Sequence, residues 1–595
     1  MPREISRRRF LEGGGMAVGV MVLGASGASL LAACGDGSSG KAGSIGVLEA
    51  PRGTLEGLRQ QVGPRLVRVT SPLKPCVSDP SGTACAAAMT DLANPFFCED
   101  EPGAFQTLGW FGAFEAHPSP YAVAAETTAD IAAAVDFARE TGVRLVVKGT
   151  GHDYQGRSSA ADSLLIWTHN MRDITLHDDF RPAGAGWSRG VPAITVGAGT
   201  RWLEAYLAAG QRGWYVQGAG CTSVGAAGGF TQGGGFGSFS KRFGTAAGNL
   251  LEVEVVTADG RVVVTNEARH ADLFWALRGG GGGTFGIVSQ MTMRAHPLPK
   301  TLGAVMGTVT AATDDDYRYL VETVVRMVPA LDNPHWGEQI GFGPGNTIRL
   351  SPLFVDLAED DARAAFSPLT QWVDRHDSAS SSPIEFFTFP FADLWNSTFW
   401  DKRSPGFIQR DLRAGQNSDL FWWESDAAQV AWYLETYQSR WLPRAAFEDS
   451  PAALAASLFA ASRRAPFALH LNKGLYGAAS QAKARDRSTC VNPAALDASA
   501  LLIMSSAQHQ VYPGIRGREP DQALARMRSA DINAAMSIVR KATPGSGAYL
   551  NEADYFEPDW QRSFWGPNYQ RLLSIKHKYD PTSLFQVHHG VGTDR

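Results

Sequence analysis

A histidine in a glycine turn, placed directly after a short apolar run, is the feature that most constrains the fold of this chain. The run 143–147 leads into Lys148-Gly149-Thr150-Gly151-His152-Asp153-Tyr154. Glycine lets the backbone adopt positive φ and approach a bound group closely. The pattern predicts a buried strand, 144–148, that feeds a histidine-bearing loop.

Two more glycine-rich loops follow. The second, 220–235, holds Cys221, and the third, 279–283, consists of consecutive glycines. The third loop follows a helical pattern at 272–277 and precedes an apolar alternation, 285–293, that predicts a strand. Runs of backbone N–H groups without side chains form concavities that bind phosphate. The first two loops each carry a nucleophilic side chain, His152 and Cys221. Together these features indicate a large, tightly held cofactor.

The common nucleotide-binding patterns do not fit these loops. None matches the Walker pattern, and none has Rossmann spacing at the start of a helix. One glycine cluster alone is explained equally well by a tight turn, but three clusters in order are harder to explain in that way. The sequence therefore argues against nucleoside triphosphates and NAD. The net charge of −5 gives no basic footprint for nucleic acid.

The order and spacing of the loops resemble the FAD-binding domain of the vanillyl-alcohol oxidase superfamily, of the type shared with para-cresol methylhydroxylase (PCMH). This resemblance covers residues 114–299. The stretch 545–592, with Tyr549-Leu550-Asn551-Glu552 and Phe564-Trp565-Gly566-Pro567, is similar to the closing segment of berberine bridge enzyme-like flavoproteins. The resemblance implies an α+β fold: a PCMH-type FAD-binding domain, a substrate domain built on an antiparallel sheet, and a C-terminal segment that returns to the FAD domain.

The same resemblance implies that FAD is held by two covalent bonds. In the family, the loop histidine is joined to the flavin 8α-methyl group and the loop cysteine to C6, which by motif are His152 and Cys221. Imidazole and thiolate are suitable nucleophiles. A histidine that only hydrogen-bonds and a buried structural cysteine remain the alternatives, and Thr222 stands where the family usually has proline. Further flavin-binding positions implied are Lys148, Gly149, Thr150, Gly151, Asp153, Ser158, Val224, Gly225, Gly228, Gly229, Gly234, Gly286 and Ile287.

The resemblance also implies an activity. Val224 occupies the position that gates oxygen access, where valine accompanies oxidase behaviour and leucine accompanies dehydrogenase behaviour. We therefore expect an oxidase that acts on the CH–OH group of a carbohydrate or alcohol and reduces O2 to H2O2. The alternatives are a dehydrogenase that passes electrons to a quinone or carrier, an oxidase of CH–NH groups and, outside enzymes, a lipoprotein that uses a degenerate flavin fold to bind a ligand.

Two positions that carry a proton-exchanging side chain in relatives are phenylalanine in this chain. Phe236 stands where relatives often have tyrosine, and Phe230 where plant enzymes have histidine. The Tyr-x-Asn motif of the family lines the substrate face of the flavin, so we predict Tyr549 or Glu552 as base or base partner, with Asn551 beside them. An apolar flavin face would raise the pKa of a carboxyl group; the alternative is that Glu552 pairs with a cation. Weaker candidates are Glu385, Glu424 and His470.

The N-terminal part of the chain carries signals for export rather than for folding. Ser6-Arg7-Arg8-Arg9-Phe10-Leu11 is a twin-arginine signal, and Leu31-Ala32-Ala33-Cys34 resembles a lipobox. We expect export to the periplasm or cell surface with a lipid at Cys34, or plain cleavage as the alternative. A chain of 595 residues exceeds one core. The expected divisions are signal 1–34, tether and N-terminal segment 35–113, FAD domain 114–299, substrate domain 300–542 and C-terminal segment 543–595.

The remaining local signals concern cysteines, aromatic residues and caps. We expect Cys76 and Cys85 to form a disulfide, because similar extracellular relatives carry such a bridge; Cys98 and Cys490 are left unassigned. The cysteine spacing does not suit zinc, so no metal is expected. Most aromatic side chains of 300–542 are predicted to be core.

Two local patterns predict secondary structure in the expected FAD domain. A helix over 130–139 is expected to be capped by Thr128 and stopped by Gly142. A β-hairpin is expected from the strands 250–257 and 261–265.

Overall fold

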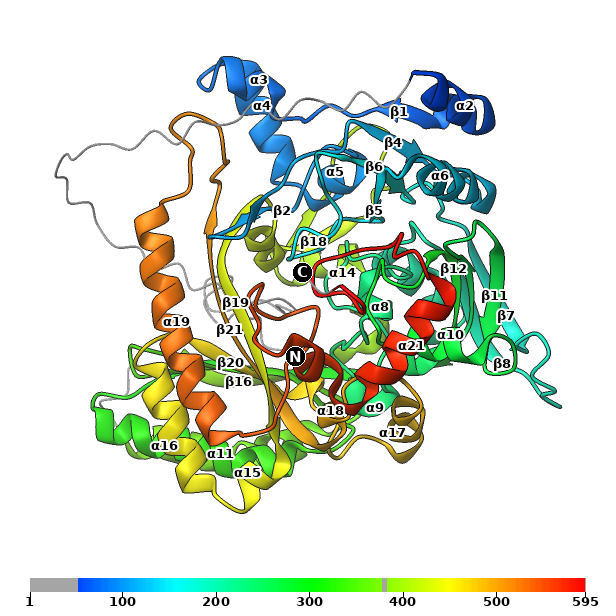
Figure 1. Cartoon of the computed structure of the whole chain (residues 1–595). Helices are drawn as coiled ribbons and strands as arrows, with labels where there is room; N and C mark the ends of the chain where they lie inside the picture. The colour runs from blue at the N-terminus through cyan, green and yellow to red at the C-terminus, as the bar shows by residue number, and fades with distance from the viewer. Residues whose placement is uncertain (1–51, 377–381, 594–595) are drawn as a thin grey trace.

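The computed structural model describes residues 52–376 and 382–593, which form an α+β fold (Figure 1). The described residues contain a four-stranded, a six-stranded and a nine-stranded sheet, with a two-stranded ribbon of β17 (Ile408–Arg410) and β18 (Phe421–Trp423). The expected signal segment and the glycine-rich part of the tether lie outside the described residues. None of the helices in the described part is long and apolar enough to cross a membrane.

The four-stranded sheet delivers the histidine loop. Strands β4, β6 and β5 are parallel to one another, and β1 is antiparallel at the edge. The predicted buried strand 144–148 is confirmed as β5, whose last residue opens the glycine turn. The strand order is β1 (Leu66–Arg68), β4 (Tyr121–Ala124), β6 (Ser163–Trp167) and β5 (Arg144–Lys148).

The helix α6 (Thr128–Thr141) connects β4 to β5, and its ends follow from local chemistry. The predicted cap, Thr128, was wrong by one residue. The hydroxyl of Thr127 accepts the N–H of Asp130, whose carboxylate accepts the N–H of Thr127 in return, so the capping box starts one residue earlier. Gly142 ends the helix in the left-handed region with φ 72°, as predicted.

The six-stranded sheet is antiparallel and follows the four-stranded one along the chain. The predicted hairpin is confirmed, since β10 pairs with β11 across a tight turn. The strand predicted after the third glycine loop is also confirmed, although it starts later, at Ile287. The order is β11 (Val262–Asn266), β10 (Leu250–Val256), β12 (Ile287–Pro297), β8 (Val191–Gly197) and β7 (Ile174–Phe180), with β9 (Trp214–Val216) on β12.

The nine-stranded sheet forms the second lobe. Helices α11 (Asp314–Leu331), α16 (Pro451–Ser462) and α19 (Gln522–Ala542) share one apolar core with it, and they lie together on the lower left in Figure 1. The order is β16 (Ser382–Pro390), β13 (Thr301–Thr310), β15 (Thr347–Val355), β14 (Trp336–Gly343), β20 (Phe467–His470), β21 (Ala498–His509), β19 (Trp432–Pro443), β2 (Thr107–Trp110) and β3 (Phe114–Glu115).

The expected antiparallel sheet is confirmed, with one addition. Strand β2, from the N-terminal segment, joins its edge in parallel with β19, and β3 extends it. Phe114, where we expected the FAD domain to begin, therefore lies on the sheet of the other lobe. Most aromatic side chains of this lobe are core, as predicted. Those fully or nearly fully buried include Phe391, Trp400, Phe421, Trp422 and Trp423.

The C-terminal segment returns to the part of the chain that carries the glycine loops, as the resemblance implied. Helix α21 (Tyr569–Tyr579) carries the buried Lys576, whose Nζ donates to the Thr284 carbonyl at 2.8 Å. The indole of Trp565 donates to the Gly279 carbonyl at 2.9 Å. The acceptors are the first glycine of the third loop and the residue directly after its last glycine, so the segment fixes both ends of that loop.

Cysteine pairing in the N-terminal segment agrees with the expectation. Cys76 and Cys85 form a disulfide. Cys98 and Cys490 are buried free thiols, as is Cys221.

Candidate active site

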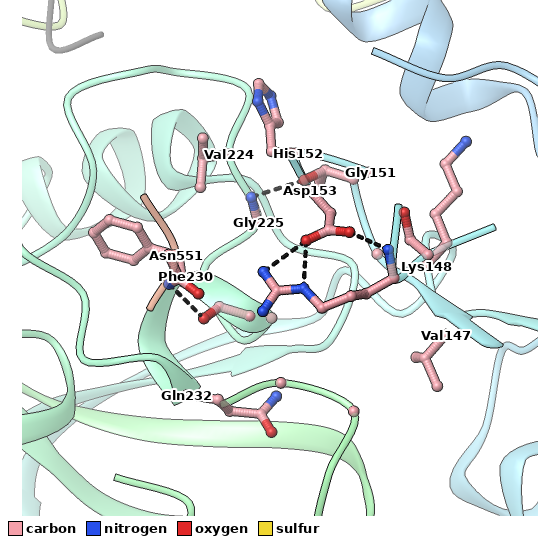
Figure 2. Close-up of a pocket in the computed structure, with 18 of the residues that line it drawn as sticks. Val147, Lys148, Gly151, His152, Asp153, Val224, Gly225, Phe230, Gln232 and Asn551 are labelled. Atoms are coloured by element: carbon pink, nitrogen blue, oxygen red, sulfur yellow. Dashed lines mark hydrogen bonds and ion pairs between the residues drawn. The ribbon is translucent and has the colours of Figure 1, made fainter. Parts of the chain in front are cut away.

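One pocket is lined by all three glycine loops and by the C-terminal segment (Figure 2). His152 and Cys221 both line it, and so do Tyr549, Asn551 and Glu552. Among the predicted flavin-binding positions, Gly234 does not line the pocket; its backbone carbonyl instead accepts the N–H of Ala247. The other predicted residues in the wall are Lys148, Gly149, Thr150, Gly151, Asp153, Ser158, Val224, Gly225, Gly228, Gly229, Gly286 and Ile287.

Hydrogen bonds hold the histidine loop against the cysteine loop. The backbone N–H of Gly225 donates to Thr150 Oγ1 at 2.9 Å. His152 Nε2 lies 2.9 Å from Ser223 Oγ, and the same hydroxyl lies 3.6 Å from Cys221 Sγ. Ser223 therefore stands between the two nucleophilic side chains and fixes their relative positions.

A buried charge pair lies behind His152. Glu99 Oε1 is 3.8 Å from His152 Nε2, while Glu99 Oε2 accepts from Arg201 Nε at 2.5 Å. Glu99 and Arg201 are both fully buried. Within the described residues, His152 Nε2 has a hydrogen-bond partner and Nδ1 has none.

Lys148 and Asp153 shape the histidine turn rather than present a free charge. The Lys148 Nζ donates to the carbonyls of Cys98, Glu101 and Ala104 at 2.8 to 2.9 Å. Burial lowers the pKa of this amine to about 8. Only the stem of Lys148 is thus available to a ligand. Asp153 Oδ1 accepts from Arg157 Nε at 2.7 Å, which closes the turn (Figure 2).

The C-terminal candidates form a connected group in the pocket wall. Asn551 Nδ2 donates to the Tyr549 hydroxyl at 3.0 Å and to the Gly229 carbonyl at 3.1 Å. Burial raises the pKa of Tyr549, and the charge of Glu552 raises it further. Glu552 Oε1 itself accepts a hydrogen bond from Lys473 Nζ at 2.5 Å. The cation pairing that the sequence left open as the alternative for Glu552 is therefore present.

Sequence reasoning missed several side chains of the wall, among them Lys473, Gln429 and Tyr154. Lys473 and Gln429 come from the second lobe, and Tyr154 donates to Gln429 Oε1 at 3.1 Å. Tyr154 belongs to the histidine motif, but its side-chain role was not anticipated. No local pattern marks Lys473 or Gln429.

The weaker candidates for the base do not line the pocket. Glu424 is exposed and Glu385 lies in β16. His470 is buried, and its burial lowers its pKa well below the usual range. Its imidazole therefore stays neutral, away from the pocket.

The wall suits a long, phosphate-bearing cofactor. A Cβ at Gly229 would meet no atom within 4 Å, so bare backbone faces the pocket there. Gly151 and Gly283 have φ values of 83° and 71°, a conformation that favours glycine. Glycine walls of this kind with two nucleophiles fit the dinucleotide and the ring system of FAD. Residues 52–376 and 382–593 contain no group of three or more His, Cys, Asp or Glu that could hold a metal ion.

Comparison with known proteins supports the same class. A family model described as an FAD binding domain matches residues 119–266, and one described as berberine and berberine like matches 548–592. The VAO-type flavoprotein oxidase VAO615 of Thermothelomyces thermophilus is 33% identical over 484 residues, which cover 80% of this chain and 76% of that protein.

Solved structures share the fold. The VAO-type flavoprotein MtVAO615 from Myceliophthora thermophila C1 has a TM-score of 0.72 at 26% identity, over 91% of this chain and 95% of that one. Glucooligosaccharide oxidase from Acremonium strictum, which is described as having a 6-S-cysteinyl, 8α-N1-histidyl FAD, has a TM-score of 0.59 at 19% identity, over 82% of this chain and 94% of that one.

The fold and the pocket define an FAD-linked oxidoreductase. More specifically, the chain belongs to the vanillyl-alcohol oxidase superfamily and, within it, to the berberine bridge enzyme-like flavoproteins. Family membership sets aside the hypothesis that the fold is a degenerate binding module.

Proposed function

We propose that the enzyme is an oxidase with FAD attached through both His152 and Cys221, and that it acts on the CH–OH group of a carbohydrate or alcohol. The observation that carries this proposal is that both side chains line one pocket and are bridged by Ser223. When bound, FAD supplies the hydride acceptor and passes the electrons to O2, giving H2O2.

The orientation of His152 supports the histidyl link. A proton on Nε2 that is donated to Ser223 leaves the Nδ1 lone pair free to form a bond. Nδ1 is the N1 position of imidazole, the same ring position as in the 8α-N1-histidyl FAD of glucooligosaccharide oxidase. The name of that oxidase refers to an oligosaccharide, which supports the proposal that a carbohydrate is the substrate here.

Oxygen consumption separates the proposed oxidase from a dehydrogenase. With a panel of sugars and alcohols, we expect a substrate to drive O2 uptake and release peroxide in equal amount. Val224 supports this expectation, because it lines the pocket and the family resemblance assigns it to the oxygen gate. An oxygen electrode and a peroxidase-coupled assay measure both. A flat oxygen trace with a substrate that reduces an artificial acceptor would contradict the oxidase and support the dehydrogenase; reaction only with amines would support CH–NH oxidation.

The group of Tyr549, Asn551 and Glu552 is proposed to take up the substrate proton. Lys473 holds the Glu552 carboxylate in place, and Asn551 holds the Tyr549 hydroxyl. A general base must lie within hydrogen-bond reach of the proton it accepts, and both residues are in the pocket wall.

Replacing Tyr549 or Glu552 should slow reduction of the flavin but should not prevent its attachment. We expect Tyr549→Phe and Glu552→Gln each to lower the rate about 10²- to 10⁴-fold, measured by stopped-flow absorbance with a proven substrate. Tyr317→Phe is the matched control, because Tyr317 is buried in the core of the second lobe and does not line the pocket. Wild-type rates in both test variants would exclude them as base.

We also propose export by the twin-arginine route with a lipid on Cys34, supported by Arg7-Arg8-Arg9 and by the Leu31-Ala32-Ala33-Cys34 sequence. A mature N-terminal peptide without acyl mass would exclude the lipid.

A further inference from the structure

A buried carboxyl group lies beside Cys221. Asp426, in the 3₁₀ helix η4 (Glu424–Gln429), is 2% exposed. Its carboxylate oxygens accept from no N–H or O–H group of the described residues. The donor that lies against them is the Cys221 thiol. Burying a carboxyl group without stronger donors is costly, so its position calls for an explanation.

The cysteine loop is fastened to the segment that carries Asp426, on both sides of Cys221. The indole of Trp423 donates to the Gly220 carbonyl at 3.0 Å. The hydroxyl of Thr222 donates to the Phe421 carbonyl at 2.6 Å. Phe421 and Trp423 belong to β18, which runs directly into η4. The same contacts give Thr222 a function at the position where the family usually has proline.

The thiol needs a proton acceptor before it can act as a nucleophile. Burial raises the pKa of Cys221 well above its usual range, and the charge of Asp426 raises it further. Thiolate, not thiol, forms the bond. The neighbouring Ser223 hydroxyl, at 3.6 Å, is not a base at neutral pH.

A carboxylate next to the thiol removes this difficulty. The two groups together carry one negative charge whether the shared proton sits on sulfur or on oxygen, so the transfer brings no additional charge into the buried site. Burial raises the pKa of Asp426 to about 7, and a base whose pKa lies near the working pH is suited to accept a proton.

We propose that Asp426 is the proton acceptor that generates the Cys221 thiolate when the cysteine is joined to FAD. The S–H bond breaks and an O–H bond forms on the carboxylate. Over the whole attachment, the S–H bond and one ring C–H bond break and one S–C bond forms. The two electrons and two protons reduce O2 to H2O2. The inference rests on the proposed cysteinyl link, and its test separates the two.

Peptide mapping of the purified holoenzyme tests the assignment. The protein is denatured, alkylated with iodoacetamide and digested, and the Cys221 peptide is quantified as flavin adduct or as alkylated thiol. We expect wild type to give the adduct and Asp426→Asn to give at least about tenfold less of it, because removal of a general base slows a step by about 10²- to 10⁴-fold. The His152 link keeps flavin on the variant chain, which shows that the variant has folded around its cofactor.

Two further variants distinguish a base from a structural role. Asp426→Glu retains a carboxylate and should restore most of the adduct. Asp486→Asn is the matched control, because Asp486 is another buried aspartate, with its pKa raised by burial to about 6, that does not line the pocket, and it should keep the adduct. Wild-type adduct in Asp426→Asn, or an equal loss in Asp486→Asn, would overturn the role of Asp426. Absence of the adduct from wild type would instead overturn the cysteinyl link.

Discussion

The double variant His152→Ala/Cys221→Ala should release all of its flavin on acid denaturation, whereas wild type and both single variants keep flavin on the chain. Each nucleophile lines the pocket independently, so one bond survives the loss of the other. Intact mass and the visible spectrum after acid precipitation measure the attached fraction. The two single variants should also differ from wild type in spectrum, because each lacks a different ring substituent.

The matched control is Cys490→Ala. Cys490 is also a buried free thiol, but it does not line the pocket, so its removal should leave both links intact. Flavin released by acid from wild type would contradict covalent attachment. Retention by the double variant would show that another residue forms a link.

The parts of the site that lie in one stretch of chain could be predicted from the sequence. The strand, the glycine turn and His152 are consecutive, and the strand's apolar pattern and the turn's glycines mark them locally. Cys221 and the Tyr549 to Glu552 group were found because whole motifs resemble a family, and the pocket then brings them together.

The parts that depend on tertiary contacts could not be predicted. Lys473 and Asp426 reach the site from the second lobe, and neither stands in a motif. Lys148 was assigned to the flavin, but its amine is engaged by carbonyls of the N-terminal segment. Charged side chains in a sequence do not reveal which of several loops will surround them after folding.

The N-terminal segment is joined to the FAD domain by buried charge. Arg201, the residue before α7 (Trp202–Gly210), is fully buried and contacts Glu99 and Asp100 of α5 (Pro95–Asp100). Its guanidinium also lies over the Phe96 ring, 4.8 Å from the centroid. These contacts place Glu99 behind His152, so the stability of this region and the position of the flavin-linking histidine depend on the same residues.

Arg201→Met should lower the free energy of unfolding by about 3–5 kcal/mol, because it leaves the Glu99 charge buried without its partner. Urea unfolding followed by tryptophan fluorescence measures the loss. Arg212→Met is the control: Arg212 and Asp178 form an exposed pair, at 50% and 72% side-chain exposure, and such pairs contribute at most about 1 kcal/mol.

The double variant Glu99→Gln/Arg201→Met should recover part of the loss, since removing both charges leaves neither unpaired. This recovery identifies the cause as an unpaired charge rather than lost packing over Phe96, because the double variant lacks the same arginine stem. A loss in Arg201→Met no larger than in Arg212→Met would contradict the argument, and it would mean that water or His152 compensates Glu99 once Arg201 is gone.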